Sequence, residues 1–268
     1  SFWERNDDFV TDDNKRGQRT AYRLGMNATT SFFRDFTLPG RTMDRVMEKI
    51  RHEIKPELLY TYVPYVDQAD LPDFAGLIDE QHSVTAAVTN TLMAKFKGKN
   101  GATSYLEILR FKLAQGYGIK EARRNVGGSA AARRPFGDID MDLDLKPSAH
   151  VAFYVRNLLN FNSGRWEKSN YDLKMTDTRG DAASLGYRYT ADLLEEINLS
   201  FRAFVTKSLD LSYDFKRNLL DRHDIRNAIG FNYSRQCWGI GLSYADAASD
   251  RTVMLSLSLS GLGGVGQK

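Results

Sequence analysis

The sequence has few of the residues that cross-link a fold or break an extended chain. Among its 268 residues are one cysteine, Cys237, six prolines and four histidines. A single cysteine cannot form a disulfide within the chain. No stretch approaches the roughly 18 consecutive apolar residues of a membrane-spanning helix, so a helical membrane protein is excluded.

An excess of charge of one sign is also absent. The formal net charge is +3, and the lysines and arginines are scattered along the chain, so the charge indicates no nucleic-acid partner. The histidines, at positions 52, 82, 150 and 223, lack the spacing of a metal motif, and we expect no metal site and no cofactor. The 42% hydrophobic content still requires a folded protein.

What the chain does contain is alternation of polar and apolar residues. The stretch DIDMDLDL, residues 138–145, places four carboxylates at every second position. Successive side chains of a strand point to opposite faces, so the segment forms a strand with one acidic and one apolar face. The acidic row is Asp138, Asp140, Asp142 and Asp144. Taken alone, the segment could equally be a half-buried strand of a soluble β-sandwich.

The same period recurs along the chain and predicts about 13 strands and no amphipathic helix. Pro56 interrupts one strand and suggests a bulge or a sheet edge. The strands recur about every 20 residues and span about ten, the length that crosses a bilayer at a tilt. Tyrosines gather near strand ends, as in the aromatic girdles of membrane barrels. The pattern therefore predicts an all-β, antiparallel transmembrane β-barrel with the aspartates facing the lumen, and a soluble β protein is the alternative.

The connections alternate between long and short. Long segments follow the second and fourth strands, at residues 63–81 and 119–135, whereas KGKNG and KPS are short. In outer-membrane barrels the long loops are external and the short turns periplasmic. Counting forward places the turn with Cys237 on the periplasmic side.

Other sites are weakly indicated. The acidic row could bind Ca²⁺, but we expect it to pair with lumenal cations such as Arg110, Lys112, Arg156 or Lys174. Ser148 and His150 form the nearest local nucleophile and base pair, yet they lie on a short turn. No catalytic residue is therefore assigned, and the chain is predicted not to be an enzyme.

Two stretches resemble the LptD family, an OstA-like family of outer-membrane lipopolysaccharide-assembly proteins. The first is IKPELLYTYVPYVDQADLPDFAG, residues 54–76. The second is FNYSRQCWGIGLSYADAASDRTVMLSLSLSGLGGVG, residues 231–266, in its Cys-Trp, its Leu-Ser-Tyr and its final Gly-Leu-Gly. The resemblance covers nearly the whole chain.

The resemblance implies a translocon that carries lipopolysaccharide from a periplasmic bridge, through the barrel lumen and a lateral gate, into the outer leaflet of a Gram-negative cell envelope. The family has a periplasmic jelly-roll domain before a barrel of about 26 strands, at the large end of known barrels. Residues 1–268 would then be one domain, the carboxyl-terminal half of the barrel, without the jelly roll. The implied partners are lipopolysaccharide, outer-membrane lipid, an LptE-like plug lipoprotein and an LptA-like bridge that reaches the missing domain.

Site residues also follow from the resemblance. Cys237 matches one of two adjacent cysteines that bond to the family's amino-terminal domain, and Gln236 stands where the other would be. An unpaired thiol is the alternative. The last strand resembles the family's lateral-gate strand and comprises Val253, Met254, Leu255, Ser256, Leu257, Ser258, Leu259 and Ser260. A porin-like diffusion channel is the alternative function.

Overall fold

A computed structural model describes residues 2–10, 16–37, 40–41, 45–68, 77–98, 100–125, 132–247, 250–259 and 263–265. These residues form 17 strand segments and one short helix, α1 (Ile119–Arg123). The strands are β1 (Phe2–Val10), β2 (Arg16–Thr29), β3 (Phe32–Phe36), β4 (Gly40–Arg41), β5 (Arg45–Val63), β6 (Gln81–Gly98), β7 (Thr103–Gly118), β8 (Phe136–Ser148), β9 (Val151–Leu159), β10 (Trp166–Thr176), β11 (Ala182–Thr190), β12 (Leu194–Phe204), β13 (Leu209–Asn218), β14 (His223–Ser234), β15 (Trp238–Ala247), β16 (Asp250–Leu259) and β17 (Gly263–Val265).

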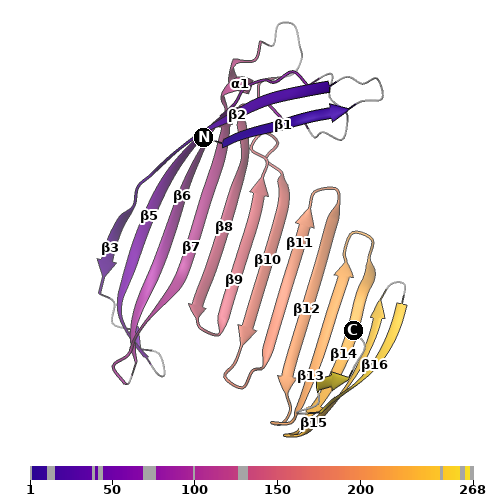
Figure 1. The fold of residues 1–268 in the computed structure, drawn as a ribbon. Coiled ribbons are helices and arrows are strands. Elements are labelled where there is room, and N and C mark those ends of the chain that lie inside the picture. The colour runs from indigo at the N-terminus through magenta and orange to yellow at the C-terminus, as the bar shows by residue number, and fades with distance from the viewer. Residues whose placement is uncertain are drawn as a thin grey trace.

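The strands form a single antiparallel meander. From β5 to β17 each strand pairs with the strand before it and the strand after it in the sequence (Figure 1). All thirteen strands expected from the alternation are present. The prediction of an all-β antiparallel fold is therefore confirmed.

Pro56 explains an interruption at the start of the sheet. β2, β3 and β4 follow one another along β5, and the break between β2 and β3 lies opposite Pro56. The carbonyl of Pro56 accepts a hydrogen bond from the Thr30 N–H at 3.3 Å. Because proline has no N–H to donate to the neighbouring strand, the ladder of hydrogen bonds is interrupted there, and one long strand is divided into β2 and β3.

Some elements were not expected, among them β1 and α1. β1 pairs with β2, but its sequence FWERNDDFV contains a polar run that hides the period of two. α1 is a single short helix in a fold that is otherwise all-β. Its five residues are shorter than any window in which a helical period can be recognised.

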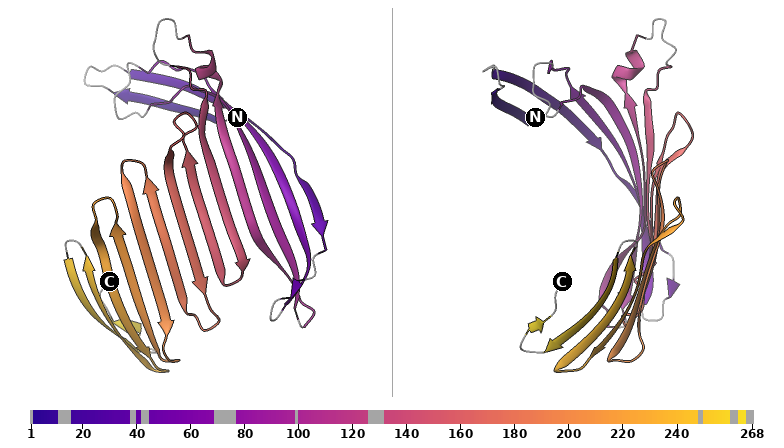
Figure 2. Two further views of the ribbon diagram at one scale, coloured as in Figure 1. Left: turned by 180° about the vertical axis from the view of Figure 1, so that it is seen from behind. Right: turned by 90° about the vertical axis from the view of Figure 1, so that its right-hand side faces the viewer.

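The sheet curves into an open arc, which Figure 2 shows edge-on. In the described part of the chain, no strand pairing joins β16 to β1 or β2 across the gap. β17 pairs with the end of β16, at residues Leu257–Leu259. No helix among the described residues is long and apolar enough to cross a membrane.

The sheet has almost no core of its own. The apolar residues that are buried within the described part are Ala21, Val63, Ala94, Phe96 and Ala228, and no large side chain there is fully buried. The accessible surface is 19253 Å². A globular monomer of 30.4 kDa exposes about 11,800 Å². This chain alone therefore exposes thousands of Å² more surface than a globular protein of its mass, and large apolar side chains such as Val253 and Leu255 are among its exposed residues.

The connections fall at the two ends of the sheet. α1 and the β9–β10 connection lie at one end, and the β6–β7, β8–β9 and β14–β15 turns lie at the other (Figure 1). The long segments at residues 63–81 and 119–135 begin where β5 and β7 end, and both of these strands end on the side of the sheet that carries α1. The prediction of an external and a periplasmic end rests on this alternation of long and short connections.

Candidate functional site

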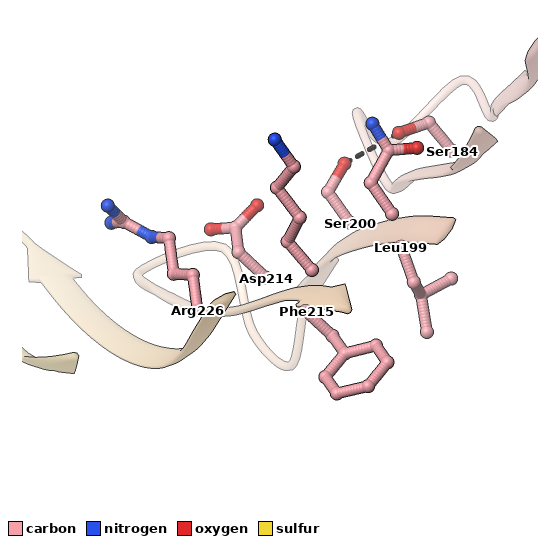
Figure 3. A pocket seen from close by; sticks show the side chains of 8 residues that line it. Ser184, Leu199, Ser200, Asp214, Phe215 and Arg226 are labelled. Atoms are coloured by element: carbon pink, nitrogen blue, oxygen red, sulfur yellow. Dashed lines mark hydrogen bonds between the residues drawn. The ribbon is translucent and has the colours of Figure 1, made fainter. Parts of the chain in front are cut away.

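The candidate site is one face of the sheet, which we call the polar face. Cross-strand partners share a face, and one such line runs through Ser184, Ser200 and Asp214. The line beside it, on the opposite face, runs through Leu185, Leu199 and Phe215, and we call that the apolar face. Figure 3 shows Ser200 and Asp214 on one side of the strands, with Leu199 and Phe215 on the other.

The acidic row of β8 meets a single arginine of β9. Arg156 contacts Asp144 at 2.6 Å through Nη2 and Asp142 at 3.2 Å through Nε. It is one of the four cations expected from the sequence. Arg110 and Lys112 lie opposite Asp144 and Asp142 in the β7–β8 register, where their charges also face the row.

Of the other two expected members of the row, Asp140 keeps the alternation and Asp138 lies at a register shift. Asp140 lies opposite Leu158 of β9, in step with Asp142 and Asp144. Asp138 lies where the β7–β8 register shifts, between the pairs that Phe136 and Ile139 form with β7. The strict alternation of the sequence is therefore broken at this end of the strand.

Arg156 also holds the backbone of its own seam. Its Nη1 donates to the carbonyls of Val155 at 2.8 Å and Leu143 at 3.1 Å. The guanidinium thus bridges β8 and β9 through main chain and side chain together. Planar, multidentate donation of this kind is a property of arginine that lysine lacks.

The same arrangement recurs between β10 and β11. Arg188 Nη2 donates to Asp172 at 2.7 Å, and Nη1 donates to the carbonyls of Tyr187 at 3.0 Å and Tyr171 at 3.3 Å. Here the guanidinium meets one carboxylate instead of a row. Two separate seams of the polar face are therefore tied by the same device in different electrostatic surroundings.

The seam between β12 and β13 carries two further ion pairs. Arg202 donates to both oxygens of Asp210 at 3.1 and 3.2 Å, and Asn232 of β14 adds a bond to the same carboxylate at 3.2 Å. Lys216 pairs with Glu196 at 3.0 Å. Asp210 is 7% exposed, so its charge is kept in a nearly buried site by three donors.

A pocket on the polar face crosses strands β11 to β14. It has a volume of about 360 Å³, and Figure 3 shows its lining from close by. The polar lining residues are Ser184, Asn198, Ser200, Asp214, Lys216 and Arg226. The Ser184 and Ser200 hydroxyls lie 2.6 Å apart. The alternation of the sequence did not predict this polar pocket, although Lys216 and Arg226 each occupy a polar position in the alternation.

The seam between β15 and β16 has a different character. Small residues occupy its polar face, where Gly239 lies opposite Ser258 and Gly241 opposite Ser256. A β-carbon at Gly241 would lie 2.5 Å from the Ser256 hydroxyl oxygen. The ion pair recorded at this seam joins the exposed Arg251 to Asp246, at 3.3 Å. On the polar face, side chains therefore add little to the backbone hydrogen bonds that hold β16 to β15.

The expected gate residues lie on both faces of β16. Val253, Leu255, Leu257 and Leu259 form an exposed apolar row, and Met254, Ser256 and Ser258 lie on the polar face. Ser260 lies outside the described residues. The last long strand of the sheet thus carries an apolar row on one face and a row of mostly small polar residues on the other.

Cys237 is a free, exposed thiol in the turn between β14 and β15. The turn lies at the end of the sheet opposite α1, together with the short β6–β7 and β8–β9 turns (Figure 1). The thiol is therefore reachable from that end. Its bond to another domain stays a prediction.

The alternative chemical sites gain little from the structure. In the β8–β9 turn, the contact between Ser148 and His150 is made by the backbone N–H of His150, at 3.2 Å from the serine oxygen, and not by the imidazole. Within the described ranges, no group of three or more His, Cys, Asp or Glu side chains is arranged to hold a metal ion. The acidic row has Arg156 where a Ca²⁺ ion would need to bind.

Outside the strands, a carboxylate organises the segment around α1. Glu121 accepts hydrogen bonds from the Arg124 side chain at 2.9 and 3.0 Å and from the backbone N–H of Arg134 at 3.1 Å. The Arg124 side chain, and then the Arg134 N–H, hold the pKa of Glu121 below its ordinary value of 4.5, although desolvation opposes them. The carboxylate therefore fastens the returning chain to α1.

Comparison with known proteins gives consistent matches. The sequence model of the LptD family, described as LPS transport system D, matches residues 2–219, which end before β14. The LPS-assembly protein LptD of Nitrosomonas eutropha is 24% identical over 258 residues, which cover 87% of this chain and 33% of that protein. The protein of the same name from Nitrosococcus oceani is 25% identical over 282 residues, covering 93% of this chain and 35% of that protein. In Acinetobacter baumannii the relative is 23% identical and the match covers 82% of this chain.

The chain spans about a third of the length of these curated relatives. The family resemblance noted in two short stretches thus extends over most of the chain.

Proposed function

The chain belongs to the LptD family, LPS transport system D, and we propose that it forms part of an outer-membrane barrel that moves lipopolysaccharide into the outer leaflet. The observation that carries this proposal is the family match over residues 2–219. The matched relatives are named for LPS assembly, so a transport role and not an enzymatic one is the activity that we assign.

The two faces of the sheet suit this role. We propose that the apolar face lies against membrane lipid and that the polar face lines the lumen. A single open sheet with large exposed apolar side chains needs such a covering phase, because apolar surface in water is costly. Because the charged side chains on the lumenal side are ion-paired, they would bind sugar and phosphate groups only weakly, and these groups could pass.

The chain would supply the carboxyl-terminal portion of the barrel. Its length, about a third of the relatives, leaves room for the other strands and for a periplasmic jelly-roll domain. We propose that this domain receives lipopolysaccharide from an LptA-like bridge and that Cys237 bonds to it. An LptE-like lipoprotein would occupy the lumen beside the polar face.

The lateral gate is assigned to β16. Among the described residues, the polar face of its seam with β15 has no arginine like Arg156 or Arg188, and the ion pair of Arg251 with Asp246 lies on the other face. The partner strand on the other side of β16 would come from the rest of the barrel. Because the polar face of β16 carries mostly small residues, such as Ser256 and Ser258, a seam between β16 and that partner strand would open with little loss of polar side-chain interaction, which favours passage of a glycolipid with a bulky headgroup.

The experiment follows newly made, labelled lipopolysaccharide in cells in which the gene for the full-length protein is switched off. Access of the lipid to an externally added modifying enzyme reports its arrival at the surface. We expect surface delivery to stop while an unrelated outer-membrane barrel still assembles. Unchanged delivery, together with ion conductance of the purified protein in planar bilayers, would instead support the porin-like channel.

A further inference from the structure

The polar pocket places two cations side by side. Lys216 and Arg226 are direct cross-strand partners on β13 and β14. Like charges opposite one another destabilise a strand pair. Lys216 is partly neutralised by Glu196, at 3.0 Å, but among the described residues no hydrogen bond or ion pair is recorded for Arg226. The pocket therefore holds an exposed guanidinium in a place where folding alone does not favour one.

The rest of the lining matches a phosphorylated sugar. The hydroxyls of Ser184 and Ser200 and the amide of Asn198 donate and accept hydrogen bonds, as sugar hydroxyls require. Arginine presents a planar fork of donors that binds phosphate oxygens in pairs. Asp214 lies opposite Ser200 and two residues before Lys216 on β13, and Figure 3 shows it between Ser200 and Arg226, so a phosphate held by Lys216 and Arg226 would have this carboxylate beside it.

The position of the pocket in the sheet adds a second argument. Lys216 and Arg226 lie near the β13–β14 turn, at the end of the sheet that carries α1. From there to the β16 edge, a step of two strands or about 10 Å, the polar face carries no lysine or arginine in the described part of the chain. Ala228, Ser243 and Ala245 lie along this route. These two cations are thus the last basic side chains on the polar face before the β16 edge.

We propose that the polar pocket is a transient binding station for the phosphate groups of the transported glycolipid, held by Arg226 and Lys216 before the headgroup reaches β16. This inference rests on the proposed function. The neighbouring carboxylates of Glu196 and Asp214 weaken the attraction for an anion, so that the headgroup is oriented and then released.

The test uses the full-length protein with its partner proteins and a photoreactive amino acid in place of Ser184. The probes are lipopolysaccharide and the same lipid after enzymatic removal of its phosphates. We expect R226Q to lower cross-linking to intact lipopolysaccharide about tenfold, the loss of one charge-assisted bond, and R226K to give an intermediate level, because the charge stays while the planar fork of donors is lost. The dephosphorylated lipid should cross-link weakly in every variant.

R217Q is the matched control, because Arg217 is the next residue of β13, points to the other face and pairs with Asp224 at 3.3 Å. It should cross-link like the wild type, and heat-modifiable migration in gels verifies that each variant is folded. A second photoreactive position, at Thr89 of β6 on the polar face, separates the two proposals. Labelling at Thr89 with no effect of R226Q or of phosphate removal would overturn the binding station alone. Absence of labelling at both positions would count against the lumenal route itself.

Discussion

Replacing Arg156 by glutamine should destabilise the sheet more than the same change at Arg188. The two arginines donate to two carbonyls each and to one close carboxylate, so they share the same backbone role. They differ in surroundings, because Arg156 also contacts Asp142, which lies in the acidic row. The difference between the variants therefore measures the repulsion within that row.

The magnitude follows from the strand geometry. Carboxylates at alternate positions of a strand lie about 6.6 to 7 Å apart. At that distance two charges repel by about 0.6 kcal/mol in bulk water and by about 2.4 kcal/mol at an effective dielectric of 20. Both Arg156 and Asp142 are about two-fifths exposed, so the lower part of this range applies. We expect a loss of about 2 kcal/mol for R156Q and about 0.5 to 1 kcal/mol for R188Q.

The assay is urea unfolding of the purified full-length protein in detergent, followed by its heat-modifiable migration in gels. Adding D142N to R156Q should restore about 1 kcal/mol, because one of the unneutralised charges is gone. D142N alone should have little effect. At about 1 M salt the screening length falls to about 3 Å, and the difference between R156Q and R188Q should nearly vanish.

Equal losses for R156Q and R188Q would refute this reasoning, as would a double variant that is no more stable than R156Q. Either result would mean that the carboxylates of β8 do not repel one another in the folded protein. Arg156 would then be only a backbone tie, like Arg188.

Three further outcomes follow from other parts of the chain. The lowered pKa of Glu121 means that its contribution is present above pH 4.5 and is lost as pH falls through the lowered value, so the protection factor for hydrogen exchange at the Arg134 amide, corrected for the intrinsic rate at each pH, should stay constant from about pH 8 to about pH 5 and fall only below. In E121Q that dependence on pH should disappear. G241V should impair lipopolysaccharide delivery, because its β-carbon would lie 2.5 Å from the Ser256 oxygen, whereas G25V, with nothing within 4 Å, should be tolerated; equal delivery by both would contradict this. C237S should change the migration of the full-length protein in non-reducing gels, and unchanged migration with a wild-type thiol open to alkylation would show that Cys237 is unpaired.

The strands could be predicted from the sequence because their signal is local. A period of two in a segment such as DIDMDLDL is set by the geometry of one strand and needs no knowledge of its neighbours. Pro56 was likewise readable as a defect, since a missing N–H is a property of the residue itself. β1 escaped because its run from Glu4 to Asp8 has no apolar row to reveal it.

The partners of each side chain depend on register, which one strand alone does not encode. Four cations could have met the acidic row, and the register of β8 with β9 selects Arg156 for the direct contacts. The polar pocket depends on a finer detail. The regular register of β13 and β14 places Lys216 opposite Arg226, and a shift just after this pair places Arg217 opposite Asp224. The shift gives Arg217 an anion opposite it, whereas Arg226 faces a cation, so the exposed charge of the proposed binding station follows from the pairing of the two strands, which the alternation of the sequence does not reveal.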